Sequence, residues 1–204
     1  MIEIINLELK FNEKVIFSDL NLKIERGEKI GIKGESGKGK TSLLNLIMGF
    51  ISPNIGKILI DKSEISHNNI ISIRNKMAYL PQNILLMGDK NVLDAIEYPF
   101  HYSINKKNKP KEGKIIAELE KINLKPEILS TSISKISGGE KQRIALVIAK
   151  LLGREIFLLD EPTSALDEIS RKSVMKYVFE SNDTVVSVSH DNEWLNKCSK
   201  IINF

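Results

Sequence analysis

The stretch GESGKGKTS (residues 34–42) decides the fold of this chain. It matches the pattern G-x-x-x-x-G-K-[ST] and follows EKIGIKG, an alternating apolar and polar segment typical of a strand. The apolar pattern of KTSLLNLIMGF, which begins inside this stretch at Lys40, indicates a helix. Glycines between a strand and a helix let backbone N–H groups surround phosphate oxygens, and the partial positive charge of the helix N-terminus favours anions. The stretch therefore predicts a P-loop that binds a nucleotide.

The residues of this loop have distinct expected roles. The Lys40 ammonium is expected to pair with the β- and γ-phosphates, and the Thr41 hydroxyl to bind Mg²⁺. A plain glycine turn before a helix is the alternative, but the strand, loop and helix occur in the order that a nucleotide site requires. The other expected phosphate-binding positions are Gly34, Glu35, Ser36, Gly37, Lys38, Gly39 and Ser42.

Polar side chains end two further apolar runs. REIFLLDE (residues 154–161) and TVVSVSH (residues 184–190) are typical of strands buried on both faces of a parallel sheet. Ligands bind at the carboxyl ends of such strands. We therefore expect Asp160 to hold Mg²⁺, Glu161 to take the proton of an attacking water, and His190 to contact the γ-phosphate. The alternatives are an acidic pair that merely ends a strand and a structural histidine.

A second glycine-rich stretch, SGGE, occupies residues 137–140. Ser137 and Glu140 have the spacing of a capping box, which is the structural explanation for both. It does not explain Gly138 and Gly139, which weaken a helix and leave backbone N–H groups bare. A bare helix start is suited to an anion. Because one P-loop binds one nucleotide, the second stretch is predicted to face the nucleotide of another molecule.

The periodicity along the chain predicts a mixed α/β fold in one domain, residues 1–204. Alternating apolar and polar residues over the first 33 positions indicate several antiparallel strands, with turns at residues 12–13 and 26–27. A P-loop core with a parallel sheet would follow. The segment 84–153 is predicted to be an inserted helical subdomain, with a polar loop around residues 106–113.

Composition excludes several classes of protein. The chain is 42% hydrophobic and 27% charged, as soluble globular domains are. No apolar run approaches the roughly 18 residues that cross a bilayer, and no signal peptide is expected. The single cysteine, Cys198, excludes an internal disulfide and fits a reducing cytosol. Because the lysines are scattered, we expect no nucleic-acid partner; the densest basic segment, residues 105–114, is either a solvated loop or a contact for acidic lipid or a partner.

Five motifs follow one another along the chain: GESGKGKT, YLPQN, ISGGEKQR, IFLLDEPTSALD and VSVSHD. In this order they resemble the ATP-binding subunits of ABC transporters, over nearly the whole chain. The resemblance implies the ABC ATPase fold and a head-to-tail dimer that binds two ATP molecules. Each ATP would lie between the P-loop of one copy and Ser137, Gly138 and Gly139 of the other copy.

The resemblance also implies roles for residues outside the glycine-rich stretches. Gln82 is expected to reach Mg²⁺ and the attacking water and to respond to the membrane partner, and Asp167 to cross the dimer interface. Phe11 lies where the family places an aromatic residue that stacks on adenine, although it could equally be a half-buried strand residue. Glu140 replaces the glutamine that is commonest at its position, which is a familiar variant.

The implied partners are a second copy of the chain and a transmembrane permease subunit that is a separate chain, with the ATPase on the cytoplasmic face of the cell membrane. NVLDAIEYPFHY (residues 91–102) is similar to the small ATPases of metal (iron) export. Amino-acid uptake and lipoprotein or peptide export are alternatives. A soluble ABC-type ATPase is a further alternative, although such proteins usually carry two domains or a long insertion. A P-loop kinase would need neither SGGE nor SALD.

Overall fold

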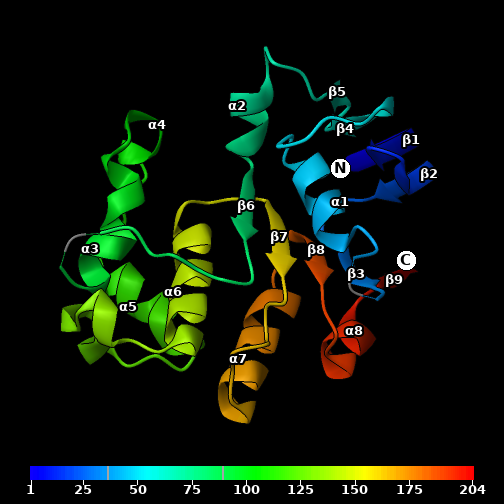
Figure 1. Cartoon of the computed structure of the whole chain (residues 1–204). Coiled ribbons are helices and arrows are strands. Elements are labelled where there is room, and N and C mark those ends of the chain that lie inside the picture. The colour runs from blue at the N-terminus through cyan, green and yellow to red at the C-terminus, as the bar shows by residue number, and fades with distance from the viewer. Residues whose placement is uncertain (36, 89) are drawn as a thin grey trace. The chain divides into compact units, whose positions relative to one another are not determined.

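The computed structural model describes residues 1–35, 37–88 and 90–204 and has the predicted mixed α/β fold (Figure 1). Its residues form two compact units. The first unit contains residues Met1–Tyr79, Glu155–Glu161 and Asn182–Phe204. The second unit contains Leu80–Arg154 and Pro162–Ser181. Each unit has its own hydrophobic core and is described by itself.

An antiparallel sheet begins the first unit, as the alternating pattern predicts. Its strand order is β2-β1-β4-β5. The bounds are β1 Ile2–Phe11, β2 Lys14–Ile24, β4 Ile55–Ile60 and β5 Ser63–Glu64. Apolar residues at alternate positions of β1, such as Ile2 and Ile4, are buried, because successive side chains point to opposite faces of a sheet. The turns at residues 12–13 and 26–27 are confirmed.

A parallel sheet supplies the strand ends on which the predicted site depends. Its order is β6-β7-β8-β3-β9. All five residues of β7 and all five of β8 are buried, as expected for strands covered on both faces. The last strand, β9, pairs with β3 at the edge of this sheet. The bounds are β3 Lys29–Lys33, β6 Met77–Leu80, β7 Ile156–Asp160, β8 Thr184–Val188 and β9 Lys200–Asn203.

Helix α1 (Lys40–Ile47) follows the glycine loop and packs its apolar side into the core of the first unit. Leu43, Leu44 and Ile47 are completely buried in a cluster that includes residues of both sheets. Burying side chains of this size contributes about 1.5–3 kcal/mol each, so the helix that begins at the loop is firmly anchored. The short helices α2 (Ile70–Arg74) and α8 (Asn192–Lys197) complete this unit.

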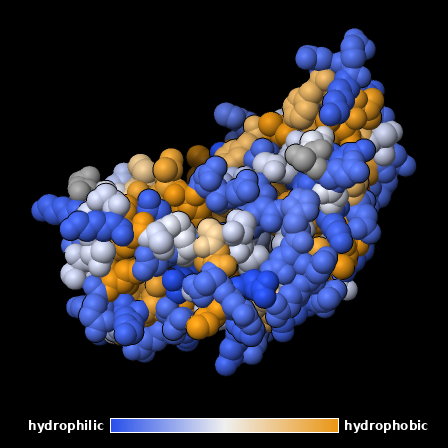
Figure 2. All heavy atoms as spheres, turned by 60° about the horizontal axis from the view of Figure 1, so that its bottom comes forward, coloured by the Kyte–Doolittle hydropathy of each residue, from blue (hydrophilic) through white to orange (hydrophobic). Residues whose placement is uncertain are grey.

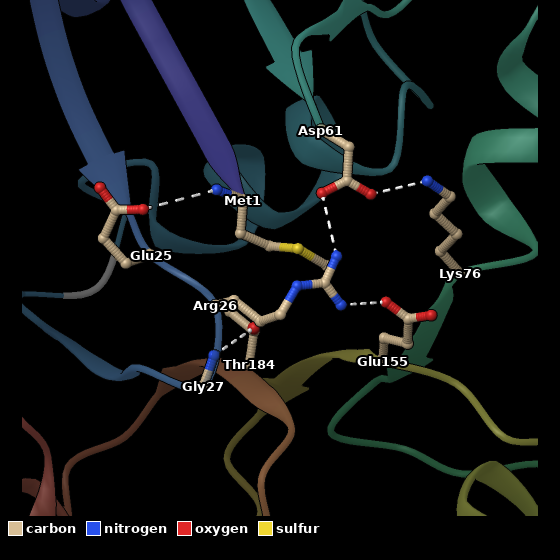
Figure 3. Close-up of polar contacts among 8 residues, drawn as sticks. All are labelled: Met1, Glu25, Arg26, Gly27, Asp61, Lys76, Glu155 and Thr184. Atoms are coloured by element: carbon tan, nitrogen blue, oxygen red, sulfur yellow. Dashed lines mark hydrogen bonds and ion pairs between the residues drawn. The ribbon is translucent and has the colours of Figure 1, made fainter.

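A charge network connects the turns of the first unit (Figure 3). The Arg26 guanidinium donates to carboxylates of both Asp61 and Glu155, and the Lys76 ammonium lies 2.6 Å from the other oxygen of Asp61. These residues lie in the turns after β2 and β4 and just before β6 and β7. The network therefore ties the antiparallel sheet to the parallel sheet with paired charges.

The second unit is helical. Its α-helices are α3 Val92–Glu97, α4 Ser103–Lys106, α5 Glu112–Lys121, α6 Gly138–Leu151 and α7 Glu168–Phe179, with 3₁₀ turns at Tyr98–His101, Pro126–Ser130 and Ile133–Lys135. Ile115 and Leu119 of α5 and Ile144 and Val147 of α6 are fully buried in its core. The polar loop predicted at residues 106–113 is shorter than expected, because α5 begins at Glu112.

On the face shown in Figure 2, hydrophilic side chains predominate and apolar side chains occur in small groups. Among the helices that the structure describes, none has the length and apolar character of a membrane span.

Candidate nucleotide site

The glycine loop follows β3 and ends at the start of α1. Gly37 and Gly39 have φ angles of +77° and +90°, which favour glycine. A Cβ on Gly39 would lie 2.3 Å from Cγ2 of Ile16, so this position also has no room for a side chain. No side chain caps the N-terminus of α1, and its first turn has no acidic residue. The backbone N–H groups there are suited to an anion. The predicted contact of Ser36 lies outside the described residues.

Lys40 is largely buried at the start of α1. Its Nζ donates to the carbonyl oxygens of Gly34 and Glu35, at 2.7 and 2.8 Å. Both acceptors belong to the loop itself. The ammonium is therefore held within the loop by neutral carbonyl groups, so its charge is available to a phosphate.

Thr41 and Asp160 come together at the end of β7. The Thr41 hydroxyl donates to Oδ2 of Asp160 at 2.9 Å. Hydroxyl and carboxylate oxygens are the donors that Mg²⁺ prefers, and protein Mg²⁺ sites usually take one or two carboxylates with phosphates and water. Among the described residues there is no cluster of three or more His, Cys, Asp or Glu that could hold a metal alone. The Thr41–Asp160 pair fits a magnesium ion that is shared with nucleotide phosphates.

Glu161 directly follows β7 and has an unusual backbone. Its φ is +53°, a region that a glutamate rarely adopts, and its N–H donates to the carbonyl oxygen of Val188 at 2.9 Å. Strained backbone of this kind concentrates at functional sites. The Glu161 side chain lies beside His190, which follows β8. Oε2 accepts the backbone N–H of His190 at 3.4 Å, and Oε1 lies 3.6 Å from Nε2 of that histidine.

The environment of Glu161 adjusts its proton affinity. Burial raises the pKa of the Glu161 carboxyl above its ordinary value. The backbone N–H and the imidazole of His190 act in the opposite direction, but they do not overcome burial. A carboxylate with a raised pKa is a better proton acceptor, which is what a general base near neutral pH requires.

Phe11 ends β1 in the first unit. It is a strand residue that is 47% exposed, so both the stacking role and the alternative of a half-buried strand residue stay open. An exposed ring is available to stack on a base, although stacking on adenine stays a prediction.

The second glycine segment (residues 137–140) begins α6 in the second unit. The capping box is present: Glu140 N–H donates to Ser137 Oγ at 3.2 Å, and Ser137 N–H donates to Glu140 Oε2 at 2.7 Å. The two glycines differ. A Cβ on Gly139 would lie 2.7 Å from the carbonyl oxygen of Ala165, whereas a Cβ on Gly138 would meet nothing nearer than 3.9 Å. Close packing against Ala165 thus explains why residue 139 is a glycine, which the sequence did not reveal. Ser137 and Gly138, in contrast, are exposed.

Arg143 supports this segment and was missed in the sequence. It is buried, and its guanidinium donates to the carbonyl oxygens of Gly139, Ile122 and Asn123. The guanidinium therefore joins the first turn of α6 to the end of α5. The one sign of this role in the sequence is an arginine four residues after Gly139, in an otherwise apolar part of the helix.

Two other predicted site residues also lie in the second unit. Asp167 caps α7: its oxygens accept the N–H of Ser170 at 2.9 Å and its hydroxyl at 2.8 Å. Those hydrogen bonds from Ser170 lower the pKa of Asp167. Gln82 follows β6 and is exposed. The structure thus groups the predicted residues into two sets. Lys40, Thr41, Asp160, Glu161, His190 and Phe11 belong to the first unit, and Gln82, Asp167 and residues 137–140 to the second.

Comparisons with known proteins agree with this geometry. Residues 17–164 match the sequence model of the family described as ABC transporter. The chain is 32% identical over 198 residues to the ergothioneine transport ATP-binding protein EgtV of Helicobacter pylori (strain G27), covering 95% of this chain and 91% of that protein. It is 32% identical over 206 residues to the probable iron export ATP-binding protein FetA of Escherichia coli (strain K12), covering 99% and 90%.

A solved structure has the same fold over the full length of the chain. It is the dimeric ATP-binding cassette MJ0796 in a post-hydrolysis state with ADP and Pi. The TM-score is 0.84 at 28% identity, and the match covers 100% of this chain and 94% of that one.

Proposed function

Because this chain belongs to the ABC transporter family, as an ATP-binding subunit with ATPase activity, we propose that it hydrolyses ATP with Mg²⁺ at the interface of a head-to-tail homodimer. It would drive a transmembrane permease that is a separate chain, from the cytoplasmic face of the membrane. The observation that carries the proposal is the division of the site. The first unit contains the cation, the hydroxyl–carboxylate pair and the base, while the second unit presents Ser137 and Gly138 at an exposed helix start.

The chemistry follows from the residues of the first unit. Lys40 and the loop N–H groups would bind the β- and γ-phosphates, and Thr41 with Asp160 would hold Mg²⁺, which supplies charge neutralisation on the phosphates. A water oxygen attacks the γ-phosphorus while Glu161 accepts the water proton. The bond to the β-phosphate oxygen breaks, and ADP and inorganic phosphate leave. His190 lies close enough to Glu161 for its imidazole to face the same γ-phosphate.

The second copy completes the site. The exposed N-terminus of α6 carries bare N–H groups and partial positive charge, which suit the γ-phosphate of a neighbouring nucleotide. Gln82 and Asp167 would contribute at the metal and at the interface. The dimeric state of the cassette with ADP and Pi supports this arrangement.

We propose a metal ion such as iron as the exported cargo. The support is the similarity of residues 91–102 to metal-export ATPases and the probable iron export protein, which matches 99% of this chain. A small amino-acid-derived solute is the second candidate, because the ergothioneine transport protein matches at the same 32% identity. Cellular iron content after deletion of the gene, compared with uptake of labelled ergothioneine, distinguishes the two.

The test of the mechanism is the Glu161→Gln variant, tagged and purified from its own cell membranes with ATP. Removing the base should lower ATP turnover by about 100-fold or more, while ATP binding is retained and the dimer accumulates. Size-exclusion chromatography measures the dimer, and mass spectrometry of the co-purified proteins identifies the permease. The unsubstituted chain with ADP is the control. A variant that stays monomeric with ATP, or that recovers no polytopic membrane protein, contradicts the proposal.

A further inference from the structure

The second unit has a cleft of about 550 Å³ that the nucleotide site does not use. It lies among the helices α5, α6 and α7, all within that unit. Four lysines line it: Lys114, Lys121, Lys150 and Lys176. Their concentration around one hollow is a local feature of a chain whose lysines are otherwise scattered.

The floor of the cleft is held by fixed contacts. Oε1 of Glu118 lies 2.7 Å from Lys121 Nζ, and Oε2 accepts the Tyr177 hydroxyl at 2.6 Å. Burial alone would raise the pKa of Glu118, but the hydrogen bonds from Lys121 and Tyr177 hold that pKa below its ordinary value. The Lys150 ammonium lies 5.7 Å from the centre of the Tyr177 ring. Glu118 thus remains a carboxylate whose charge is already balanced.

The charges in the cleft are mostly positive. Its lining has four lysines and two carboxylates, Glu118 and Glu180, which leaves an excess of two positive charges. Within the part of the chain that the structure describes, neither Lys114 nor Lys176 has a carboxylate partner. Flexible ammonium groups around a concave surface are suited to phosphate oxygens.

Helix ends account for some of these lysines. Lys121, Lys150 and Lys176 lie in the last turns of α5, α6 and α7, where the helix dipole favours a cation. Lys114 is different. It is the third residue of α5, where the dipole disfavours a cation, and none of the described residues forms an ion pair with it. Helix stability therefore does not explain the complete set.

We propose that this cleft binds a small polyanion that carries two or more phosphate groups, with Lys114, Lys150 and Lys176 as its cationic contacts. The site is separate from the P-loop and does not depend on the proposed dimer. Its position matters for that dimer, because Ser137 and Asp167 are the N-cap residues of α6 and α7, and both helices end at the cleft. A ligand that bridges Lys150 and Lys176 would fix the two helices that present those residues.

The experiment is calorimetric titration of the full-length chain with inorganic tripolyphosphate. The parent protein carries Lys40→Ala, which removes the main cation of the P-loop; a second parent carries Thr41→Ala as well, which also removes the hydroxyl of the loop that would bind Mg²⁺. In both, Lys114→Glu with Lys176→Glu should weaken tripolyphosphate binding at least about tenfold. Lys106→Glu with Lys107→Glu is the matched control, because it makes the same charge change at exposed residues outside the cleft.

The outcomes separate the cleft from general attraction of anions. Loss of binding in the cleft variant with less than about a twofold change in the control supports the site. Equal losses in both variants, or no binding to either parent, overturn it. ATP turnover is measured in the same proteins without the Lys40→Ala and Thr41→Ala changes, so a failure of the cleft is distinguishable from a failure of the ATPase proposal.

Discussion

The two units each begin a helix with glycines, but they use these helix starts differently. In the first unit the start of α1 is surrounded by the groups that complete it: Lys40 is bonded to its own loop and Thr41 to Asp160. In the second unit the start of α6 is held by its own capping box and by Arg143, and Ser137 faces outward. The start of α1 is bonded to groups of its own unit, whereas the start of α6 leaves Ser137 exposed to a binding partner. Mutations should therefore be able to change ATP binding by the first unit without changing the second unit, and the reverse.

The largest effect on ATP binding by the first unit is expected from Lys40→Ala. The variant removes the ammonium that pairs with the phosphates, and loss of a charged hydrogen bond of about 2 kcal/mol corresponds to roughly a 30-fold loss of ATP affinity. Fluorescent ATP titration of the monomer measures it. The second unit should be unaffected, so its α-helical circular dichroism should not change.

Lys38→Ala is the matched control for Lys40→Ala. Lys38 belongs to the same loop and is exposed, and its Nζ lies 4.0 Å from Oε2 of Glu35. Its removal should weaken ATP binding much less. Equal losses of ATP affinity in the two variants would show that only the total charge of the loop matters and that the buried position of Lys40 does not.

The next effect concerns the second unit. Gly139→Ala places a Cβ 2.7 Å from a backbone carbonyl oxygen, so the start of α6 or the segment before α7 must shift, at a cost of about 1–3 kcal/mol. Gly138→Ala, with 3.9 Å to the nearest atom, is the matched control and should be neutral or slightly stabilising. Urea unfolding measures both. ATP affinity of the monomer should be the same in both variants; loss of ATP binding with Gly139→Ala would contradict the separation.

Within the first unit the sequence predicted some elements better than others, for a physical reason. The P-loop, β7 and β8 are local patterns: a fixed glycine spacing and continuous apolar runs. By contrast, β9 has only four residues and exists because Ile201 and its neighbours pair with β3, about 170 positions earlier. A strand that depends on pairing with such a distant segment is hard to recognise from its own few residues.

The site shows the same limit. Asp160 and Glu161 were identified from their place after a buried strand, but the positive φ of Glu161 was not, because glutamate rarely adopts it. The packing role of Gly139 depends on Ala165, which is distant in the sequence. Arg143 was missed because its acceptors are backbone carbonyl groups, which no residue pattern specifies.

The smallest effect is expected within the first unit, in the pH dependence of His190→Ala. Glu161 must be deprotonated to accept a proton, so turnover rises with pH through its raised pKa. The imidazole of His190 lowers the pKa of Glu161, whereas the backbone N–H contact does not depend on the side chain. Removing the imidazole should therefore raise the pKa of Glu161 further and move the acidic limb of the rate profile to higher pH. Turnover measured from pH 5 to 9 checks this, and Glu161→Gln, which has no titrating base, should lack that limb. A limb that does not move would mean that the imidazole has no effect on Glu161, and a limb that moves to lower pH would contradict the predicted direction.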